Sequence, residues 1–350
     1  MDFKNNKWKV IGLISIIVII LIGLFIVTQI GPYDKSNKKD IVVDIPSGST
    51  INTISETLYK NKLVKNKTLF KIVVKVSNKA PSIKAGKYLL NQTYSNNDIV
   101  DILASGKMYQ DGIKVTIPEG STSKEIVAIL INKDLGDREV YEKLIQDPSQ
   151  FYEKFKFLKE DDIKSLEGFL YPDTYYINEK SSEKEILSSM LSRFDKLYSD
   201  KFRKQQKELN MTLQQVVSLA SIVEKEAVLD EDRPIIASVF YNRFDIGMPL
   251  QSDATIQYIF EERKKIVTYA DLEIDSPYNS YKNKGLPPTP IASPGIKSIE
   301  ATLYPKDTDY LYFVAKIDGG NNYSKTYDEH LKYVQEYRVE RDKLNKNKEK

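Results

Sequence analysis

The feature that most constrains this chain is an uncharged apolar segment near its start, residues 10–30 (VIGLISIIVIILIGLFIVTQI). A helix of this length, at about 1.5 Å rise per residue, crosses a hydrocarbon layer of about 30 Å. A cleaved signal peptide is the alternative, but its apolar stretch is usually about 7 to 15 residues and ends in small residues. We therefore predict a transmembrane anchor at 10–30, with a cytoplasmic tail at 1–9.

The orientation of the anchor is not fixed by the charges around it. Three lysines stand on each side of the segment, Lys4, Lys7 and Lys9 before it and Lys35, Lys38 and Lys39 after it. An excess of positive charge marks the cytoplasmic side of a membrane helix, so this tie gives no answer. The short N-terminal tail and the absence of cysteine favour an extracytoplasmic body. We expect a single-pass protein of the cell membrane with a cytoplasmic N-terminus.

Composition excludes several classes of chemistry. The chain has no cysteine and one histidine, His330, so disulfides, thiol nucleophiles and multi-histidine metal sites are ruled out. The net charge of +3 gives no broad basic surface for nucleic acid. Carboxylate chemistry is the leading option for an enzyme, and we expect neither a metal nor an organic cofactor.

Two stretches of the body repeat one pattern. IVVDIPSGSTINTISETL begins at Ile41 and IKVTIPEGSTSKEIVAIL begins at Ile113, an offset of 72 residues. Each copy predicts a short strand, a turn with Pro and Gly, and a helix, and Thr122 and Glu125 have capping-box spacing. Residues 84–107 predict a further strand and helix. Such small units resemble LysM modules, which bind N-acetylated glycans, and a purely structural repeat is the equal alternative.

These patterns divide the chain into segments and give a fold class of α+β. We predict a polar linker at 31–40, a LysM-like domain at 41–111, a larger α+β catalytic domain at 112–340 that starts with the second copy, and a charged, solvated tail at 341–350. Within the larger domain, residues 130–207 are helical in pattern, with an interruption at 166–177 (LEGFLYPDTYYI). Its tyrosines either stack on a sugar or pack in the core.

One predicted helix carries the strongest chemical signal. Thr212 and Gln215 have capping-box spacing, so MTLQQVVSLASIVEKEA should form a helix from Thr212. At helical periodicity Glu224 falls within the apolar stripe, where loss of hydration would raise its pKa toward the range of a general acid. Glu226 falls on the opposite side and should face solvent. The alternative for Glu224 is a buried ion pair, for example with Arg233 or Arg243.

Two later segments supply candidate substrate-binding residues. LQSDATIQY contributes Gln251, Ser252 and Asp253, and Asp253 is either a second carboxylate or a helix cap. Residues 275–305 contain many prolines and glycines, too irregular for a helix or a central strand, and are expected to form a long ordered loop. That loop offers three donors for a polar sugar, Tyr278, Asn279 and Tyr281. The loop and LQSDATIQY are therefore predicted to line a binding site, and the helix that carries Glu224 is expected to be flanked by β-rich loops.

Several separated motifs, in order, closely resemble the YceG-like (MltG) family of endolytic murein transglycosylases. They are LASIVEKEA, SVFYNRFDIGMPLQSDATIQY, YNSYKNKGLPPTPIASPG and YLYFVAKIDGG...TYDEH. The resemblance covers nearly the whole chain and implies a membrane-anchored enzyme acting on nascent peptidoglycan glycan strands, with Glu224 matched to the family's catalytic glutamate. It also implies peptidoglycan synthases (penicillin-binding proteins) as partners. The chain departs from the family at Asn321, where members often carry histidine, whereas His330 matches the family pattern.

The resemblance implies cleavage of the MurNAc–GlcNAc bond with formation of a 1,6-anhydro-MurNAc end, which terminates or trims strand growth. In that reaction one carboxylate acts first as acid and then as base, and no external water is needed. A lysozyme-type hydrolase that uses Glu224 with Asp253 and water is one alternative. A membrane-anchored glycan-binding scaffold without catalysis is the other.

Overall fold

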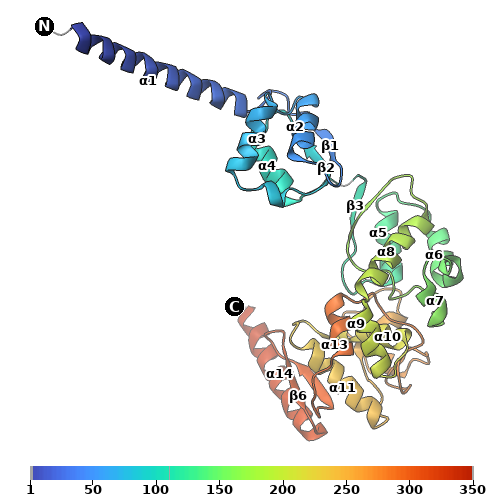
Figure 1. Cartoon of the computed structure of the whole chain (residues 1–350). Coiled ribbons are helices and arrows are strands. Elements are labelled where there is room, and N and C mark those ends of the chain that lie inside the picture. Colours follow the sequence, from blue (N-terminus) through green and yellow to red (C-terminus); the bar gives the residue numbers. More distant parts are fainter. Residues whose placement is uncertain (1–2, 110, 349–350) are drawn as a thin grey trace. The chain divides into compact units, whose positions relative to one another are not determined.

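The computed structural model describes residues 3–109 and 111–348, and its elements confirm the α+β class in a mostly helical form. The described strands form three separate two-stranded antiparallel sheets. By its internal contacts the chain divides into two compact units, Met1–Asp111 (unit 1) and Gly112–Lys350 (unit 2) (Figure 1). Each unit has its own hydrophobic core and is described separately below.

Unit 1 begins with the apolar helix α1 (Phe3–Ile30). Its stretch Ile11–Ile30 has a mean hydropathy of 3.1 and buries none of its residues against the protein. This helix is long and apolar enough to cross a membrane. It ends beside the rest of unit 1, where Lys65 Nζ donates to the Thr28 carbonyl at 3.0 Å.

The polar segment 31–40 contains no helix or strand, yet it is hydrogen-bonded to the body of unit 1. The Asp34 N–H donates to the Gln92 carbonyl at 3.0 Å, and Asn37 Nδ2 donates to Gln92 Oε1 at 2.8 Å. Asn91 Nδ2 donates to Asp40 Oδ1 at 3.2 Å. The segment is thus attached along its length to the turn around Gln92.

The rest of unit 1 packs three helices against a two-stranded sheet. Strand β1 (Ile41–Ile45) pairs with β2 (Gly86–Leu90), and alternate side chains point into the core. The helices are α2 (Ile51–Lys60), α3 (Lys67–Val76) and α4 (Asn96–Ser105), with a short 3₁₀ turn at Ala80–Ser82. The strand and helix predicted for 84–107 are confirmed as β2 and α4.

Unit 2 opens with the second copy of the repeat. Strand β3 (Ile113–Thr116) pairs with β4 (Thr174–Ile177), which forms within the predicted interruption of the helical region. Tyr171 in that region is 6% exposed, and Tyr175 donates its hydroxyl to the Tyr171 carbonyl, so both belong to the core and its edge. The helices here are α5 (Ser123–Ile131), α6 (Arg138–Gln146), α7 (Lys156–Glu160), α8 (Glu183–Leu197) and α9 (Asp200–Glu208), with a 3₁₀ turn at Pro148–Phe151.

The remainder of unit 2 is built around α10 (Leu213–Glu226). Its start at Thr212 is confirmed, because Thr212 Oγ1 accepts from the Gln215 N–H while Gln215 Oε1 accepts from the Thr212 N–H. The later elements are α11 (Arg233–Asp245), α12 (Asp253–Ile259), a 3₁₀ turn at Asp271–Glu273, α13 (Ile296–Leu303), β5 (Tyr312–Ala315), β6 (Asn321–Ser324) and α14 (Tyr327–Lys348).

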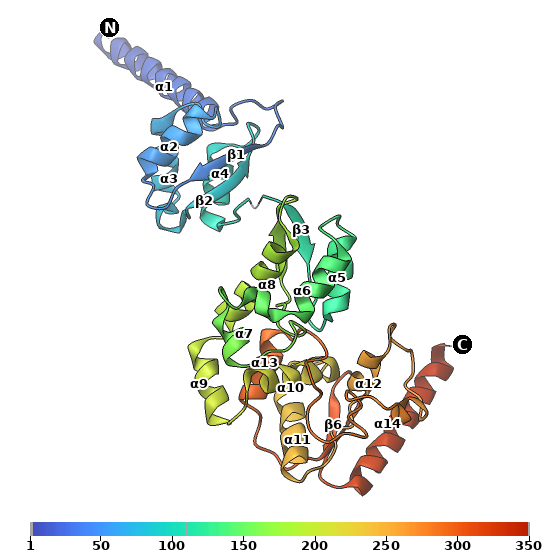
Figure 2. The same cartoon turned by 90° about the vertical axis from the view of Figure 1, so that its right-hand side faces the viewer.

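Two expectations about this region are wrong. The segment 275–305 is not loop throughout, because 296–303 forms α13, which packs on α10 and α11 (Figure 2). The three apolar residues Ile296, Ile299 and Leu303 recur at helical spacing and explain this helix. The predicted β-rich surroundings of α10 are therefore helical instead. The charged end of the chain also continues α14 as far as Lys348.

Candidate active site

The middle of helix α10 is enclosed by protein on all sides. Every residue from Val216 to Val223 is buried, including the polar Ser218 and Ser221. A helix without a solvent face does not separate an apolar stripe from a wet one, so periodicity alone cannot say which of its two terminal glutamates is enclosed. The contacts of Glu224 and Glu226 show how each carboxylate is surrounded.

Glu224 is held in a buried ion pair. Its Oε2 lies 3.2 Å from Arg233 Nη1, and the two side chains are 7% and 9% exposed. The same oxygen accepts hydrogen bonds from the Gly295 N–H at 3.0 Å and from Ser298 Oγ at 2.7 Å. The ion pair with Arg233 that was the alternative interpretation of Glu224 is therefore present. These contacts join α10 to the starts of α11 and α13.

A second carboxylate, Glu119, stands beside this ion pair and was missed in the sequence. It packs against Gly295, where an added Cβ would lie 2.2 Å from Glu119 Oε1. Burial and the nearby charge of Glu224 raise the pKa of Glu119. Its only sequence signal is its place in the Pro-Glu-Gly turn of the second repeat, which did not suggest a contact with α10.

Glu226, two residues further along, is in a different environment. Ser252 Oγ donates to its Oε1 at 2.5 Å, and the Ala254 N–H also hydrogen-bonds to the carboxylate. Burial, with a smaller contribution from the charge of Asp253, raises the pKa of Glu226, although Arg243 and the hydrogen bonds oppose this. The described residues provide Glu226 with no ion-pair partner. The expectation that Glu226 faces solvent is wrong, because the residues around Ser252 cover it.

Asp253 and Tyr281 lie next to Glu226. Tyr281 donates its hydroxyl to Asp253 Oδ1 at 2.6 Å, and burial and this carboxylate raise the pKa of the tyrosine. Asp253 is exposed and is the first residue of α12, whose N-cap is Ser252, so the helix-cap interpretation of Asp253 is wrong. Gln251 is exposed and adopts a φ of 50°, a left-handed conformation that is uncommon outside glycine. Such strain is often found at binding sites.

The loop around Tyr281 is fixed by buried polar residues. The Ser252 N–H donates to Ser280 Oγ at 3.0 Å, and the Gln251 N–H donates to the Ser280 carbonyl at 3.0 Å. Asn279 is fully buried, and its Nδ2 donates to the carbonyls of Leu272 and Ile274 at 2.8 Å each. The expectation that Asn279 binds substrate is therefore not supported, because its amide positions the loop.

Tyr278 is half-buried and contacts residues other than those around Glu226. Its hydroxyl is 2.8 Å from Thr289 Oγ1, and its ring packs against Tyr258 with centroids 4.9 Å apart. The predicted residues Gln251, Ser252, Asp253 and Tyr281 thus gather around Glu226, whereas Tyr278 supports a neighbouring pocket through Tyr258.

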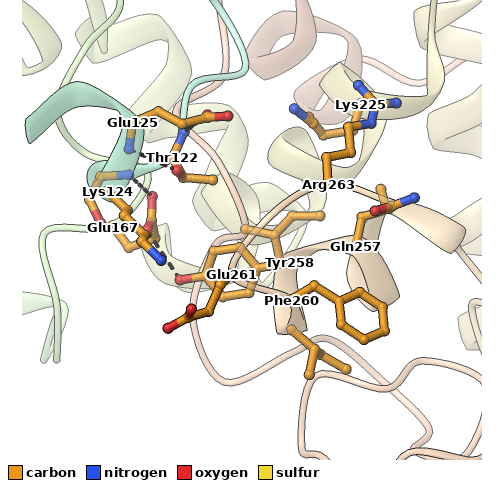
Figure 3. Close-up of a pocket in the computed structure, with 14 residues that line it drawn as sticks. Thr122, Lys124, Glu125, Glu167, Lys225, Gln257, Tyr258, Phe260, Glu261 and Arg263 are labelled. Atoms are coloured by element: carbon orange, nitrogen blue, oxygen red, sulfur yellow. Dashed lines mark hydrogen bonds between the residues drawn. The ribbon is translucent and has the colours of Figure 1, made fainter. Parts of the chain in front are cut away.

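That pocket, here called the α5–α12 pocket, has a volume of about 350 Å³. It is lined by residues 122–125, Glu167, Lys225, Ala254, 257–261, Arg263 and Ile291 (Figure 3). Glu167 is buried beside it and accepts from the Ser123 N–H, Ser123 Oγ and the Tyr258 hydroxyl at 2.9, 2.6 and 3.1 Å. Burial raises the pKa of Glu167. Ala254 belongs to both places, since it lines the pocket and its N–H bonds to Glu226.

Asn321 lies in β6 beside the start of α11, and His330 lies in α14 beside β5. Asn321 Nδ2 and the Tyr323 hydroxyl both donate to the carboxylate of Asp232, at 3.0 and 2.6 Å. The His330 ring stacks on Tyr312 with centroids 5.4 Å apart. Both residues therefore make contacts that hold β5, β6 and α14 to the rest of unit 2.

The described residues offer no candidate metal site. Across residues 3–109 and 111–348, no cluster of three or more His, Asp or Glu side chains is arranged to hold an ion.

Comparison with known proteins gives a consistent result. The model of the YceG-like family matches residues 43–336. The chain is 36% identical over 315 residues to the endolytic murein transglycosylase of Bacillus subtilis strain 168, with 87% of each chain covered. It is 35% identical over 339 residues to the protein of the same name from Streptococcus pneumoniae serotype 2 strain D39, covering 89% of this chain and 61% of that one. A crystal structure of a putative YceG-like protein from Listeria monocytogenes is 38% identical, with a TM-score of 0.59, and covers 85% of this chain and 99% of its own.

Proposed function

The chain belongs to the YceG-like family, and on that basis we propose that it is an endolytic murein transglycosylase, an enzyme that cuts within peptidoglycan glycan strands. The family match includes both glutamates at the end of α10 and the residues that surround them. The substrate is peptidoglycan. We propose further that cleavage leaves a 1,6-anhydro-MurNAc end and limits the length of nascent strands.

We propose Glu226, in place of Glu224, as the catalytic acid and base. A general acid has to hold a proton near neutral pH, and burial without an ion pair favours the protonated form of Glu226. Glu224, by contrast, forms an ion pair with Arg233 and two further hydrogen bonds, which suit a permanent carboxylate with a structural role. The observation that carries the assignment is the Ser252 hydrogen bond to the half-buried Glu226, beside the exposed Asp253 and the half-buried Tyr281.

The reaction requires one carboxyl group. Protonated Glu226 donates its proton to the glycosidic oxygen as the bond from that oxygen to C1 of MurNAc breaks, and positive charge develops at C1. The carboxylate then takes the proton of the C6 hydroxyl of the same MurNAc while O6 bonds to C1. The proton returns to Glu226 and the anhydro ring is closed. Ser252 orients the carboxyl group through its hydrogen bond, and Asp253 is placed to stabilise the charge at C1.

The location and partners follow from the same proposal. Helix α1 anchors the protein in the cell membrane with its N-terminus in the cytoplasm, so that both units face newly made peptidoglycan. Penicillin-binding proteins that polymerise the strands are the proposed partners. These statements rest on the family and on the apolar helix.

The assignment is tested with full-length protein on nascent, uncross-linked glycan strands. We expect Glu226→Gln to lower the cleavage rate by about 100-fold or more, because general acid and base catalysis is lost. Glu224→Gln should lower stability by about 1–3 kcal/mol, since Arg233 loses one of its two carboxylate partners and keeps Asp230, but the variant should still cleave below its melting temperature. Thermal unfolding followed by circular dichroism provides the control for folding. An inactive, folded Glu224→Gln beside an active Glu226→Gln would restore the assignment made from the sequence.

The products separate the two enzyme classes. Asp253 lies close enough to raise the pKa of Glu226, so hydrolysis by a carboxylate pair is a second candidate. Mass spectrometry distinguishes them, because an anhydro end is lighter than a reducing end by one water. We expect anhydro ends only. Binding of glycan without any cleavage by the wild-type protein would instead favour a non-enzymatic scaffold.

A further inference from the structure

We infer that the α5–α12 pocket binds the peptide stem of the glycan substrate through the carboxylates of that stem, so that the enzyme prefers strands that carry peptides. The inference rests on the proposed function and extends it, because it assigns a ligand to a pocket outside the group of residues around Glu226. The position of the pocket, its charges and its preformed floor support this assignment.

The pocket and the proposed catalytic carboxyl are separated by about the length of the short helix α12. Glu226 meets the first turn of α12 through Ser252 and Ala254, whereas Arg263 follows the last turn of this helix. A helix of seven residues rises about 10 Å. A group bound at Arg263 is thus further from the cleaved bond than the lactyl group of MurNAc, and at the distance of the attached peptide.

The charges in the pocket favour an anion. Lys225 and Arg263 lie at one end of it (Figure 3), and Lys124 also lines it. The side chains of Arg263 and Lys124 are exposed and have neither an ion pair nor a hydrogen bond with any residue that the structure describes. Lys225 donates one hydrogen bond, to the Gly120 carbonyl at 3.0 Å. Cationic groups with unused donors bind carboxylates well.

The acidic residues of the pocket do not cancel these cations. Glu167 accepts from Ser123 and Tyr258, and Glu125 accepts from the Thr122 N–H at 2.8 Å, so both are committed to holding the start of α5. Glu261 is exposed and lies away from Lys225 and Arg263 in Figure 3. The first turn of α5 is already capped, and this leaves the lysines and the arginine as the donors available to a ligand.

The apolar floor is built before any ligand binds. Tyr258 is fixed by the hydroxyl bond to Glu167 and by the Tyr278 ring, and Phe260, Ile259 and Ile291 complete the surface. A pocket of about 350 Å³ is of the size that small ligands occupy, and it holds a few amino-acid residues. An apolar floor with a cationic end matches a short peptide that carries carboxylates. An unsubstituted sugar chain offers no such groups.

The test compares nascent strands with the same strands after an amidase has removed their peptides. We expect the wild-type protein to cleave the stripped strands with a kcat/KM about tenfold lower, equivalent to one carboxylate contact. Arg263→Ala should raise KM about tenfold on peptide-bearing strands and leave stripped strands unaffected. Lys265→Ala is the matched control, because Lys265 is an exposed cation two residues away that does not line the pocket. Equal effects of Arg263→Ala on both substrates, or equal cleavage of both by the wild type, would overturn the inference.

A binding measurement separates this inference from the proposed function. The probe is muramyl pentapeptide, a single sugar with its stem, which contains no bond for the enzyme to cut. Calorimetry on full-length protein should give a Kd about tenfold weaker for Arg263→Ala than for Lys265→Ala. Equal Kd values for the two variants would contradict stem binding even if glycan cleavage had also failed.

Discussion

The two copies of the repeat have the same local structure and different surroundings. In both, a strand leads through a proline and a left-handed glycine, Gly48 with φ 80° and Gly120 with φ 74°, into a helix capped by threonine. The turn hydrogen bond is also shared, from Ser49 to the Pro46 carbonyl and from Ser121 to the Pro118 carbonyl. The repeated sequence therefore encodes a strand-turn-helix unit.

What differs is the set of contacts each turn makes. A Cβ added at Gly48 would meet nothing within 4 Å, whereas at Gly120 it would contact Glu224 and Lys225 at 3.5 Å. The Gly120 N–H donates to the Ser293 carbonyl and the Ser293 N–H donates to the Ser121 carbonyl, each at 2.8 Å. The comparison teaches that the repeat supplies a rigid turn, and that chemistry arises where α10 and the segment before α13 dock on that turn.

Among changes that compare the two turns, the largest effect is expected when valine replaces the turn glycines. A β-branched residue with positive φ costs about 2 kcal/mol, so Gly48→Val and Gly120→Val should destabilise their own units similarly. Only Gly120→Val should also lower glycan cleavage, by about tenfold or more, because its methyl groups displace the end of α10. Hydrogen exchange resolved by unit measures stability, and product release measures activity.

Gly285→Val controls for general damage to unit 2. Gly285 has φ 84° and open space around its Cβ position, so it shares the backbone strain of Gly120 without the contacts. If Gly285→Val or Gly48→Val reduced cleavage as much as Gly120→Val, the two turns would not differ in the way described above.

The second prediction concerns Glu167, whose bonds to Ser123 have no counterpart in the first copy, where Ile51 holds the equivalent position. At pH 5 we expect Glu167→Gln to be less stable than wild type by about 1–2 kcal/mol, since one acceptor of the Ser123 and Tyr258 donors is lost. Burial raises the folded pKa of Glu167 above the value of about 4.3 in the unfolded chain, so wild-type stability falls as pH rises through that folded value.

Glutamine does not ionise, so the stability of Glu167→Gln does not change with the titration of this position. The difference in the free energy of unfolding between wild type and Glu167→Gln should therefore become smaller from pH 5 to pH 8. Denaturant unfolding of the full chain at a series of pH values measures it. A gap that widens with pH would mean that the ionised carboxylate is the stabilising form, contrary to the effect of burial.

The sequence predicts local structure better than the site because the two depend on different distances along the chain. Thr212 and Gln215 are three residues apart and fix the start of α10 by themselves. The environment of Glu226 depends on Ser252, which only the fold brings near. Helical periodicity placed Glu226 in water because it assumes a solvent face along the whole helix, which the middle of α10 lacks. Asn279 shows the same limit, since its residue type suits a sugar and its burial excludes one.

The smallest effect is expected from a substitution that makes the first copy more like the second. Thr122 and Glu125 form a full capping box. In the first copy Thr50 caps the Thr53 N–H, but the Thr53 hydroxyl lies against Thr50 Oγ1 and leaves the Thr50 N–H without a side-chain acceptor. Thr53→Gln supplies an acceptor for the Thr50 N–H, as Gln215 does for Thr212. Thr53→Met is the matched control, because it is neutral, similar in length and similar in helix propensity. We expect the glutamine variant to protect unit 1 from hydrogen exchange by about 0.5 kcal/mol more than the methionine variant. Identical protection would mean that the box adds nothing at this site, and the stability of the second copy would then come from its docking contacts alone.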